Sequence, residues 1–386
     1  MISYSAEILF KNEADRFIMT ETIRLAMSAW NEGSRLVFEN KPELRIRQIH
    51  SLCYKVLRNF EPDVPSGMIV NIERDVMSAF MSIKSNNHNI VKAPIKNNMS
   101  IRLSGTIYKF FSANRIKLTT MSRRIIVGIK TYPQIIELFS KYKAHDPLLY
   151  EKDGKLWLQF GFELPEAPNI LEPIAMGVDL GIRNLAVTSE GIVYRDNEYN
   201  KRKRELRFEK RNLQSKGTKS ARKHLKKLKR KEKNDTKNMV HHLTNAIIKD
   251  TTANVIVIEN LKGLKINTKK YRSFNNRHAQ VPYFIIRQFL EYKAPLHGKR
   301  VATVSPAFTS QTDYRTDKRD GRRYKGAYFG YDGKVLHADV NAACNIALRS
   351  KLPILCSSTA IYGQGLVNGP IACKSFRLSK VLQDPI

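Results

Sequence analysis

Three carboxylates, far apart in the sequence, stand in otherwise apolar settings. Asp179 follows an apolar stretch, Glu259 follows the β-branched run 255–258, and Asp339 opens a segment of small residues. A carboxylate at the end of a buried strand is costly unless a cation or hydrogen bonds compensate it. Such hard oxygen ligands are what Mg²⁺ prefers, with water and substrate phosphate completing its coordination. The three residues therefore predict a divalent-metal site that can cleave a phosphodiester bond.

Each carboxylate has an ordinary alternative when taken alone. Asp179 could be a turn residue that bonds its own backbone, although Gly177 and Gly181 beside it would admit a phosphate or another backbone. Glu259 could be a solvated loop residue, but the run before it is typical of a strand buried on both faces, and α/β folds place ligands at the ends of such strands. Asp339 could be the N-cap of a helix.

The composition indicates a polyanionic partner. Lysine and arginine total 67 against 35 aspartates and glutamates, which gives a formal net charge of +32. Charge of this size is typical of nucleic-acid binding. No stretch approaches the ~20 apolar residues of a membrane-spanning helix, and the N-terminus does not read as a signal peptide, so we expect a cytoplasmic protein with no membrane partner. The four cysteines show no C-x-x-C spacing and indicate reduced thiols.

The first half of the chain predicts a β domain interrupted by helices. Residues 1–12 and 100–165 show the alternation of strands, whereas 13–99 show helical spacing. The third expected helix starts near Ser66, which we expect to be its N-cap. An Asp-Gly pair at 153–154 supplies the positive φ of a tight hairpin turn.

The second half predicts an α/β core with a mixed sheet. A proline-rich linker at 165–173 precedes it. Strands then alternate with helices over 173–305 and 337–350, with a long basic helical segment at 198–235. The remaining segments are a polar, aromatic excursion from this core and an irregular tail, at 306–336 and 351–386.

Two basic segments are candidate nucleic-acid surfaces. Between Lys201 and Lys233, 17 residues are lysine or arginine and three are glutamate. Such runs are often disordered tails, but this one lies between two core strands. The segment 315–325 mixes cations with tyrosine, which suits stacking on unpaired bases, and its alternative is a solvated loop. The residues expected to contact nucleic acid are Lys201, Arg202, Lys203, Arg204, Arg207, Arg211, Arg222, Lys223, Lys226, Lys227, Lys229, Arg230, Arg315, Arg322, Arg323, Tyr324 and Lys325.

In their order, these motifs resemble the split RuvC nuclease domain. More narrowly, they resemble the TnpB proteins encoded by insertion-sequence transposons and their relatives, the small type V CRISPR effectors. The matching phrases lie at 177–187, 256–261, 309–311 and 339–346, and the resemblance covers residues 173–350. It implies an N-terminal β-barrel-like wedge domain with a helical recognition insertion, followed by an RNase H-like (RuvC) mixed-sheet domain with a small insertion.

The resemblance also implies a function, that of an RNA-guided DNA endonuclease in the prokaryotic cytoplasm, acting at the nucleoid. A guide RNA would pair with one strand of a double-stranded target DNA, while the protein reads a short flanking motif. Asp179, Glu259 and Asp339 would hold two Mg²⁺ ions for phosphodiester hydrolysis.

One departure from the family concerns zinc. In this family, the segment that corresponds to residues 306–336 usually carries four cysteines. The corresponding positions in this chain are Thr312, Arg315, Gly326 and Phe329. Without such ligands we expect no zinc. The segment would instead be held by packing of aromatic residues, namely Tyr324, Tyr328, Phe329 and Tyr331.

Three alternatives stay open. A compact type V CRISPR effector shares all these motifs. A non-cleaving RNA-guided repressor would share them too, but it would not need an intact triad, so the intact triad of this chain speaks against it. A DNA transposase proper also uses carboxylate triads, but the basic segment between the first two acids does not suggest one. The sequence leaves open the guide RNA, the flanking motif and whether the protein is a monomer or a dimer.

Overall fold

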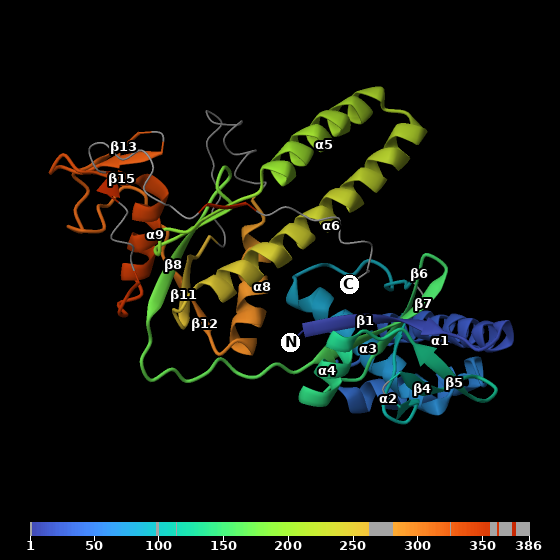
Figure 1. The fold of residues 1–386 in the computed structure, drawn as a ribbon. Coiled ribbons are helices and arrows are strands. Elements are labelled where there is room, and N and C mark those ends of the chain that lie inside the picture. Colours follow the sequence, from blue (N-terminus) through green and yellow to red (C-terminus); the bar gives the residue numbers. More distant parts are fainter. Residues whose placement is uncertain are drawn as a thin grey trace. The chain divides into compact units, whose positions relative to one another are not determined.

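The protein folds into two compact units, Met1–Leu164 and Pro165–Ile386 (Figure 1), and the boundary between them in the sequence coincides with the start of the predicted linker. The structure is a computed structural model. It describes residues 2–97, 100–112, 114–261, 281–324, 326–355, 361–362 and 373–375.

The N-terminal unit is built on a seven-stranded antiparallel sheet in the order β2-β6-β7-β1-β5-β4-β3. Its strands are β1 (Ile2–Leu9), β2 (Ser100–Arg102), β3 (Tyr108–Ser112), β4 (Arg115–Thr119), β5 (Arg124–Ile129), β6 (Leu148–Lys152) and β7 (Lys155–Phe162). Its helices are α1 (Glu13–Asn40), α2 (Ile46–Phe60), α3 (Ser66–Ser85) and α4 (Pro133–Lys141). The first three helices follow β1, at the point where the alternation of the sequence gives way to helical spacing.

Two local predictions for this unit have different outcomes. The predicted hairpin joins β6 to β7, and both Asp153 and Gly154 have positive φ, of 53° and 74°. The expected N-cap of α3 is wrong, because Ser66 is the first helical residue and Pro65 holds the cap position without a side-chain hydrogen bond. The carbonyl of Pro65 instead accepts from the amide nitrogens of Met68 and Ile69.

The C-terminal unit is built on a six-stranded mixed sheet in the order β12-β11-β8-β9-β10-β17. Strands β8, β11 and β12 run parallel, and β9 is antiparallel to both of its neighbours. The bounds are β8 (Ala175–Leu180), β9 (Ala186–Thr188), β10 (Val193–Arg195), β11 (Val255–Glu259), β12 (Arg300–Val304) and β17 (Cys373–Ser375). The helices that cover this sheet are α6 (Lys219–Asp250), α8 (Tyr283–Leu296) and α9 (Ala338–Leu348).

Successive residues of β8 and β11 point to opposite faces of the sheet. Met176, Val178, Ile256 and Ile258 pack with residues of α6 and α8. Their neighbours Ala175, Val255 and Val257 pack with Ile346 of α9. The sheet therefore lies between α6 and α8 on one face and α9 on the other (Figure 1).

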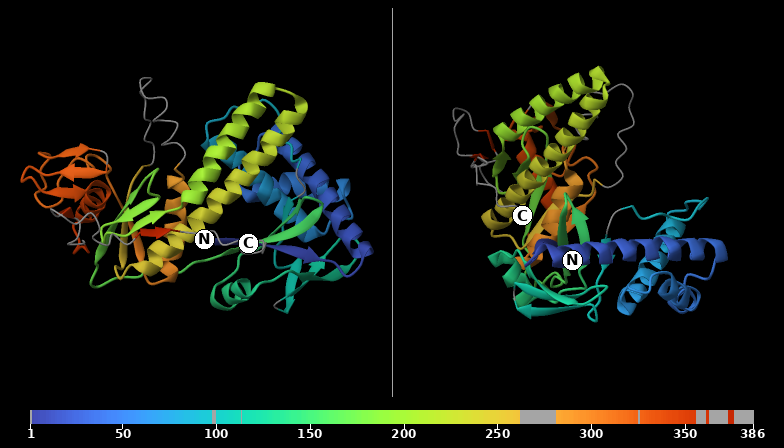
Figure 2. Two further views of the ribbon diagram at one scale, coloured as in Figure 1. Left: turned by 45° about the horizontal axis from the view of Figure 1, so that its top comes forward. Right: turned by 90° about the vertical axis from the view of Figure 1, so that its right-hand side faces the viewer.

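The basic segment is a helical hairpin and not one continuous helical segment. Helix α5 (Asn197–Lys216) ends at Gly217, whose φ is 63°, and α6 begins after Thr218. The Thr218 hydroxyl accepts from the amide of Ala221, so it caps α6. A glycine in the left-handed region followed by a threonine cap is a standard helix stop and start. The two helices stand side by side in all views (Figures 1 and 2).

The segment predicted as an excursion forms part of a four-stranded sheet in the order β13-β14-β15-β16. Its strands are β13 (Arg322–Tyr324), β14 (Ala327–Phe329), β15 (Val335–His337) and β16 (Ile361–Tyr362). The tail predicted as irregular thus contributes two short strands, because β16 pairs with β15 and β17 pairs with β10. Throughout the described ranges, no helix is long and apolar enough to span a membrane.

Candidate active site

Two of the three predicted acids lie on adjacent parallel strands. Asp179 is near the end of β8 and Glu259 ends β11, one residue beyond the paired residues Val178 and Ile258. Each acid continues the series of side chains that faces α9, since Gly177 and Val257 stand two residues before them. Neighbouring strands lie about 4.8 Å apart, so the two carboxylates share one face of the sheet at its C-terminal edge, where α/β folds bind ligands.

The third acid is brought to the same edge by close packing of α9 on β8. A Cβ atom on Gly177 would lie 1.9 Å from the carbonyl oxygen of Ala343, so the helix backbone rests directly on the strand. Asp339 is one helical turn before Ala343, in the first turn of α9. The N-cap is His337, whose Nδ1 accepts from the amide of Val340 at 3.3 Å. Asp339 therefore does not cap the helix, and its carboxylate bonds side chains of other elements instead.

Electrostatics show that Asp179 lies within the field of the other two acids. The pKa of Asp179 is raised well above its usual value, first by burial and then by the negative charges of Asp339 and Glu259. Burial also raises the pKa of Glu259, against the effect of the hydrogen bond from Thr309. Buried like charges are a local excess of negative charge, which a bound cation would relieve.

Asp339 has two side-chain partners. Its Oδ1 accepts from Nη2 of Arg323 at 2.6 Å, and its Oδ2 accepts from Nδ2 of Asn184 at 2.7 Å. Asn184 is in turn fixed by Arg195, whose Nε donates to the amide oxygen at 2.6 Å. Arg323 comes from β13, so the small sheet supplies a cation directly to the site. Sequence reasoning named Arg323 as a nucleic-acid contact but missed Asn184 and Arg195.

The donor chemistry of these residues suits Mg²⁺, which binds a few carboxylates and completes its shell with water and phosphate oxygens. The arrangement is nevertheless open. Among the described residues, no three His, Cys, Asp or Glu side chains stand together closely enough to hold one metal ion. Arg323 supplies the positive charge next to Asp339. A closed metal site would require Asp339 to exchange this guanidinium for the ion.

The asparagines of the 339–346 phrase hold a loop beside the acids. Nδ2 of Asn341 donates to the carbonyl of Thr312 at 2.7 Å, and Nδ2 of Asn345 donates to the carbonyls of Thr309 and Thr312 at 2.9 and 2.6 Å. Both asparagines are buried. The Thr309 hydroxyl donates to Glu259. The phrase therefore positions Asp339 and, through the loop, one hydrogen bond to Glu259.

Tyr283 at the start of α8 also borders the site. Burial raises the pKa of its hydroxyl to about 12, and the charges of Asp179 and Glu259 add to the effect. The sequence offered no signal for this residue, since it stands in an apolar helical pattern.

The insertion that lacks cysteines is held by an ion-pair network and one buried ring. Arg315 bonds Asp313 at 2.6 Å and Asp332 at 2.8 Å, so its guanidinium is engaged within the insertion. Tyr328 is fully buried, and its hydroxyl donates to the carbonyl of Gln311 at 3.1 Å. The expectation of general aromatic packing is wrong for three rings, which are exposed: Tyr324, Phe329 and Tyr331.

The other predicted nucleic-acid contacts lie mainly on the solvent side of the hairpin. Arg202, Lys203 and Arg207 are only partly exposed, and Nζ of Lys203 lies 3.5 Å from the hydroxyl of Tyr199. Arg322 and Tyr324 are exposed on β13, and Lys325 lies outside the described residues. The exposed members on the hairpin are Lys201, Arg204, Arg211, Arg222, Lys223, Lys226, Lys227, Lys229 and Arg230.

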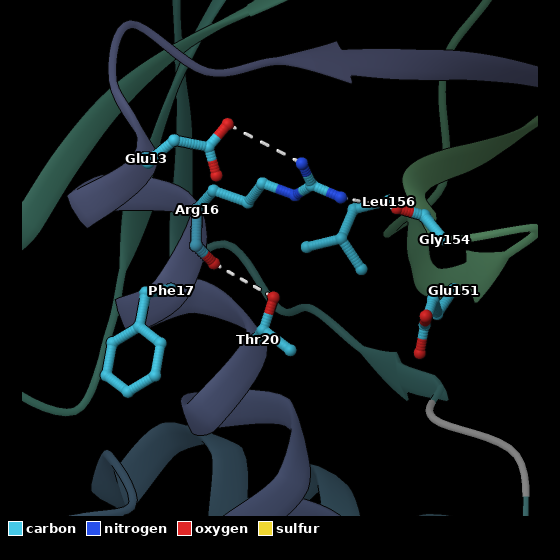
Figure 3. A pocket seen from close by; sticks show the side chains of 7 residues that line it. All are labelled: Glu13, Arg16, Phe17, Thr20, Glu151, Gly154 and Leu156. Carbon is cyan, nitrogen blue, oxygen red and sulfur yellow. Dashed lines mark hydrogen bonds and ion pairs between the residues drawn. The ribbon is translucent and has the colours of Figure 1, made fainter.

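A hollow of about 280 Å³ in the N-terminal unit has a different character (Figure 3). It lies between the start of α1 and the β6–β7 turn. Arg16 crosses it and donates to the carbonyl of Gly154 at 2.7 Å, with Glu13 at 3.6 Å. Its charged groups are thus largely paired with the protein itself, and the triad acids are not among its lining residues.

Comparison with known proteins gives two family matches. The family model OrfB_IS605, described as "Probable transposase", matches residues 163–266. The model described as "Cas12f1-like, TNB domain" matches residues 283–346. The first segment contains Asp179 and Glu259, and the second contains Asp339 and the small insertion. No curated protein sequence matches the chain.

Two solved structures have a similar fold. One is Cas12f1 in a complex with sgRNA and target DNA, with a TM-score of 0.56 and 13% identity over 87% of this chain and 82% of that one. The other is the mini-RNA-guided endonuclease CRISPR-Cas_phi3, with a TM-score of 0.52 and 11% identity over 91% of this chain and 92% of that one. The multidomain mixed α/β fold is therefore shared with these proteins. Together the matches confirm that the chain resembles the TnpB family and its relatives, the small type V CRISPR effectors.

Proposed function

We propose that this protein is an RNA-guided DNA endonuclease of the TnpB type. The observation that carries the proposal is that Asp179, Glu259 and Asp339 lie at one edge of the C-terminal sheet, on the adjacent strands β8 and β11 and on helix α9 packed against β8. Burial, and then the charges of the other two acids, raise the pKa of Asp179 there. The similarity in fold to Cas12f1 and CRISPR-Cas_phi3 supports the same class of activity. On this proposal, β8 to β12 with α6, α8 and α9 form a RuvC-like domain, and the N-terminal unit is the wedge domain with its helical recognition insertion.

Asp179, Glu259 and Asp339 would bind two Mg²⁺ ions. Metal ions in such sites activate a water molecule and stabilise the leaving oxygen of the phosphodiester. Arg323 stands beside Asp339, so on metal binding its guanidinium would be released toward the phosphate of the DNA strand. Asn184, held by Arg195, would keep Asp339 oriented during this exchange.

The partners of the proposal are a guide RNA and a double-stranded target DNA. The similar Cas12f1 structure is a complex of that protein with both kinds of nucleic acid. In this chain the net charge of +32 and the exposed cations of the α5–α6 hairpin support a polyanionic partner. Base pairing with the guide would read the target sequence, and the protein would read duplex shape and a flanking motif.

The test is cleavage of a supercoiled plasmid by the purified protein with Mg²⁺ and the transcript of its own locus. We expect cleavage only with the cognate transcript and a matching target. Equal cleavage without any transcript would overturn the guided mechanism and favour a structure-selective RuvC-like resolvase. Specific binding without cleavage would favour a non-cleaving repressor, to which the Arg323–Asp339 ion pair also lends support.

A compact type V CRISPR effector is the alternative within the same class. Both alternatives use the same site, so the chemistry does not separate them. The genes beside this one do, since a CRISPR array would favour the effector and transposon ends would favour the TnpB type.

A further inference from the structure

An exposed aromatic ring stands on the basic hairpin. Phe208 of α5 is 68% exposed, although the same helix buries Tyr199 and Leu206 against its surroundings. At 100° per residue, Phe208 points away from Leu206 by about 160°. The ring therefore belongs to the solvent face of the hairpin and not to its core.

The solvent face around Phe208 is cationic. Arg204 lies four residues before the ring and Arg211 three residues after it, so both stand next to it on the helix surface. Lys201 continues the row one turn further. All three cations are exposed, and none has an ion-pair partner within the described part of the chain. The acidic neighbours are Glu205 and Glu209, against three cations, and Glu209 lies 3.6 Å from Nε2 of His224 on α6.

We propose that Phe208 is a stacking platform for one unpaired base of the RNA that the protein binds. Arg204 and Arg211 would contact the phosphates on the two sides of that base. The inference rests on the proposed function and deepens it, because it assigns single-stranded RNA to one defined face of the hairpin. An aromatic ring between cations is the arrangement with which proteins bind single strands.

The geometry restricts the ligand to an unpaired base, and the proposed function makes the strand RNA. A base within a duplex has both ring faces covered by its neighbours, so it has no face to offer Phe208. The helix rises 1.5 Å per residue, which places Arg204 and Arg211 about 6 Å and 4.5 Å along the axis from Phe208. Stacking is tolerant of base identity, since every base has a π face. This face therefore distinguishes unpaired from paired RNA and does not read sequence.

Stacking and charge have separable signatures. Replacing the ring by alanine removes an interaction worth between about fivefold and about 150-fold in affinity for a single strand. It leaves the salt dependence unchanged, because every cation that bonds a phosphate is kept. Replacing Arg204 and Arg211 together by glutamine should instead reduce the salt slope, by about 0.7 log units for each phosphate that is no longer neutralised.

The test measures binding of the full-length protein to fluorescein-labelled polyuridine and to a long RNA duplex, in which only the terminal base pairs have a free face, over a series of salt concentrations. The variants are Phe208→Ala, Phe208→Leu and Phe208→Tyr. The control is Phe17→Ala on α1, since Phe17 is 66% exposed but has Glu13 and Glu21 four residues to each side.

We expect the alanine and leucine variants to bind polyuridine more weakly with an unchanged salt slope, and the tyrosine variant to bind like the parent. Duplex binding and the Phe17→Ala control should not change. Parental affinity in the leucine variant, or an equal loss on duplex and single strand, would overturn the stacking role. Failure of the parent protein to bind any RNA would instead overturn the proposed function itself.

Discussion

Replacing Gly177 by alanine should displace the helix that carries Asp339. The new Cβ would lie 1.9 Å from the carbonyl oxygen of Ala343 and 2.7 Å from the amide nitrogen of Ala347. Both neighbours are backbone atoms, so no side-chain rotation relieves the clash, and α9 must move by about 1.5 Å to reach ordinary van der Waals distances. Overpacking of this kind costs about 1–3 kcal/mol, and we expect a value near the upper end.

The effect on chemistry should exceed the effect on stability. A misplacement of about 1 Å at a reacting centre can reduce the rate about 100-fold, and Asp339 moves with α9. The assays are thermal unfolding and plasmid cleavage, with Gly105→Ala as the matched control, because a Cβ on Gly105 would meet no atom within 4 Å. If Gly177→Ala melted and cleaved like Gly105→Ala, the backbone of α9 would not rest directly on β8.

Three further predictions concern charges. Burial lowers the pKa of Lys293 to about 8, from 10.5, so the unfolded chain holds its proton more tightly and the free energy of unfolding should rise between pH 8 and 10.5. In urea titrations the rise should be smaller in Lys293→Met than in the parent, by up to about 3 kcal/mol, and should be unchanged in the exposed control Lys249→Met. Arg323→Gln removes the cation beside Asp339, so thermal stabilisation by Mg²⁺ should reach half of its maximum at a lower Mg²⁺ concentration than in the parent. An equal or higher Mg²⁺ concentration at half-maximum would show that the arginine does not compete with the ion. Replacing four cations of α6 by alanine should reduce the salt slope of RNA binding by about 0.7 log units for each phosphate that is no longer neutralised, and an unchanged slope would exclude this helix from the interface. The four cations are Lys226, Lys227, Lys229 and Arg230.

The placement of the acids could be predicted from local pattern. Glu259 ends a run of apolar β-branched residues, and a carboxylate after such a run must lie at a sheet edge. Asp179 and Asp339 were predicted with it because the three phrases occur in a recognisable order. The role of Asn341 and Asn345 could be seen only in the structure. Their side chains donate hydrogen bonds to the carbonyls of Thr309 and Thr312, about 30 residues earlier in the chain.

Hydrogen bonds and ion pairs between distant polar residues could not be predicted. Asn184 and Asp339 are separated by 155 positions, and no periodicity links them. In the insertion, Arg315 was predicted to contact nucleic acid, yet it pairs with Asp313 and Asp332 in the network that holds the segment. Pairing of the tail strands was missed for the same reason, because strands of two or three residues carry no detectable alternation.

The most direct test of the proposed nuclease site is cleavage by three single variants, Asp179→Asn, Glu259→Gln and Asp339→Asn, each loaded with the same guide RNA. Each substitution replaces a carboxylate by an amide and keeps the size of the side chain. We predict that each variant binds the matching DNA like the parent and fails to cut it at any Mg²⁺ concentration, and that the parent stops cutting when EDTA is added. Full cleavage by any one variant, or cleavage by the parent in EDTA, would contradict the assignment of these three acids to a metal-dependent nuclease site.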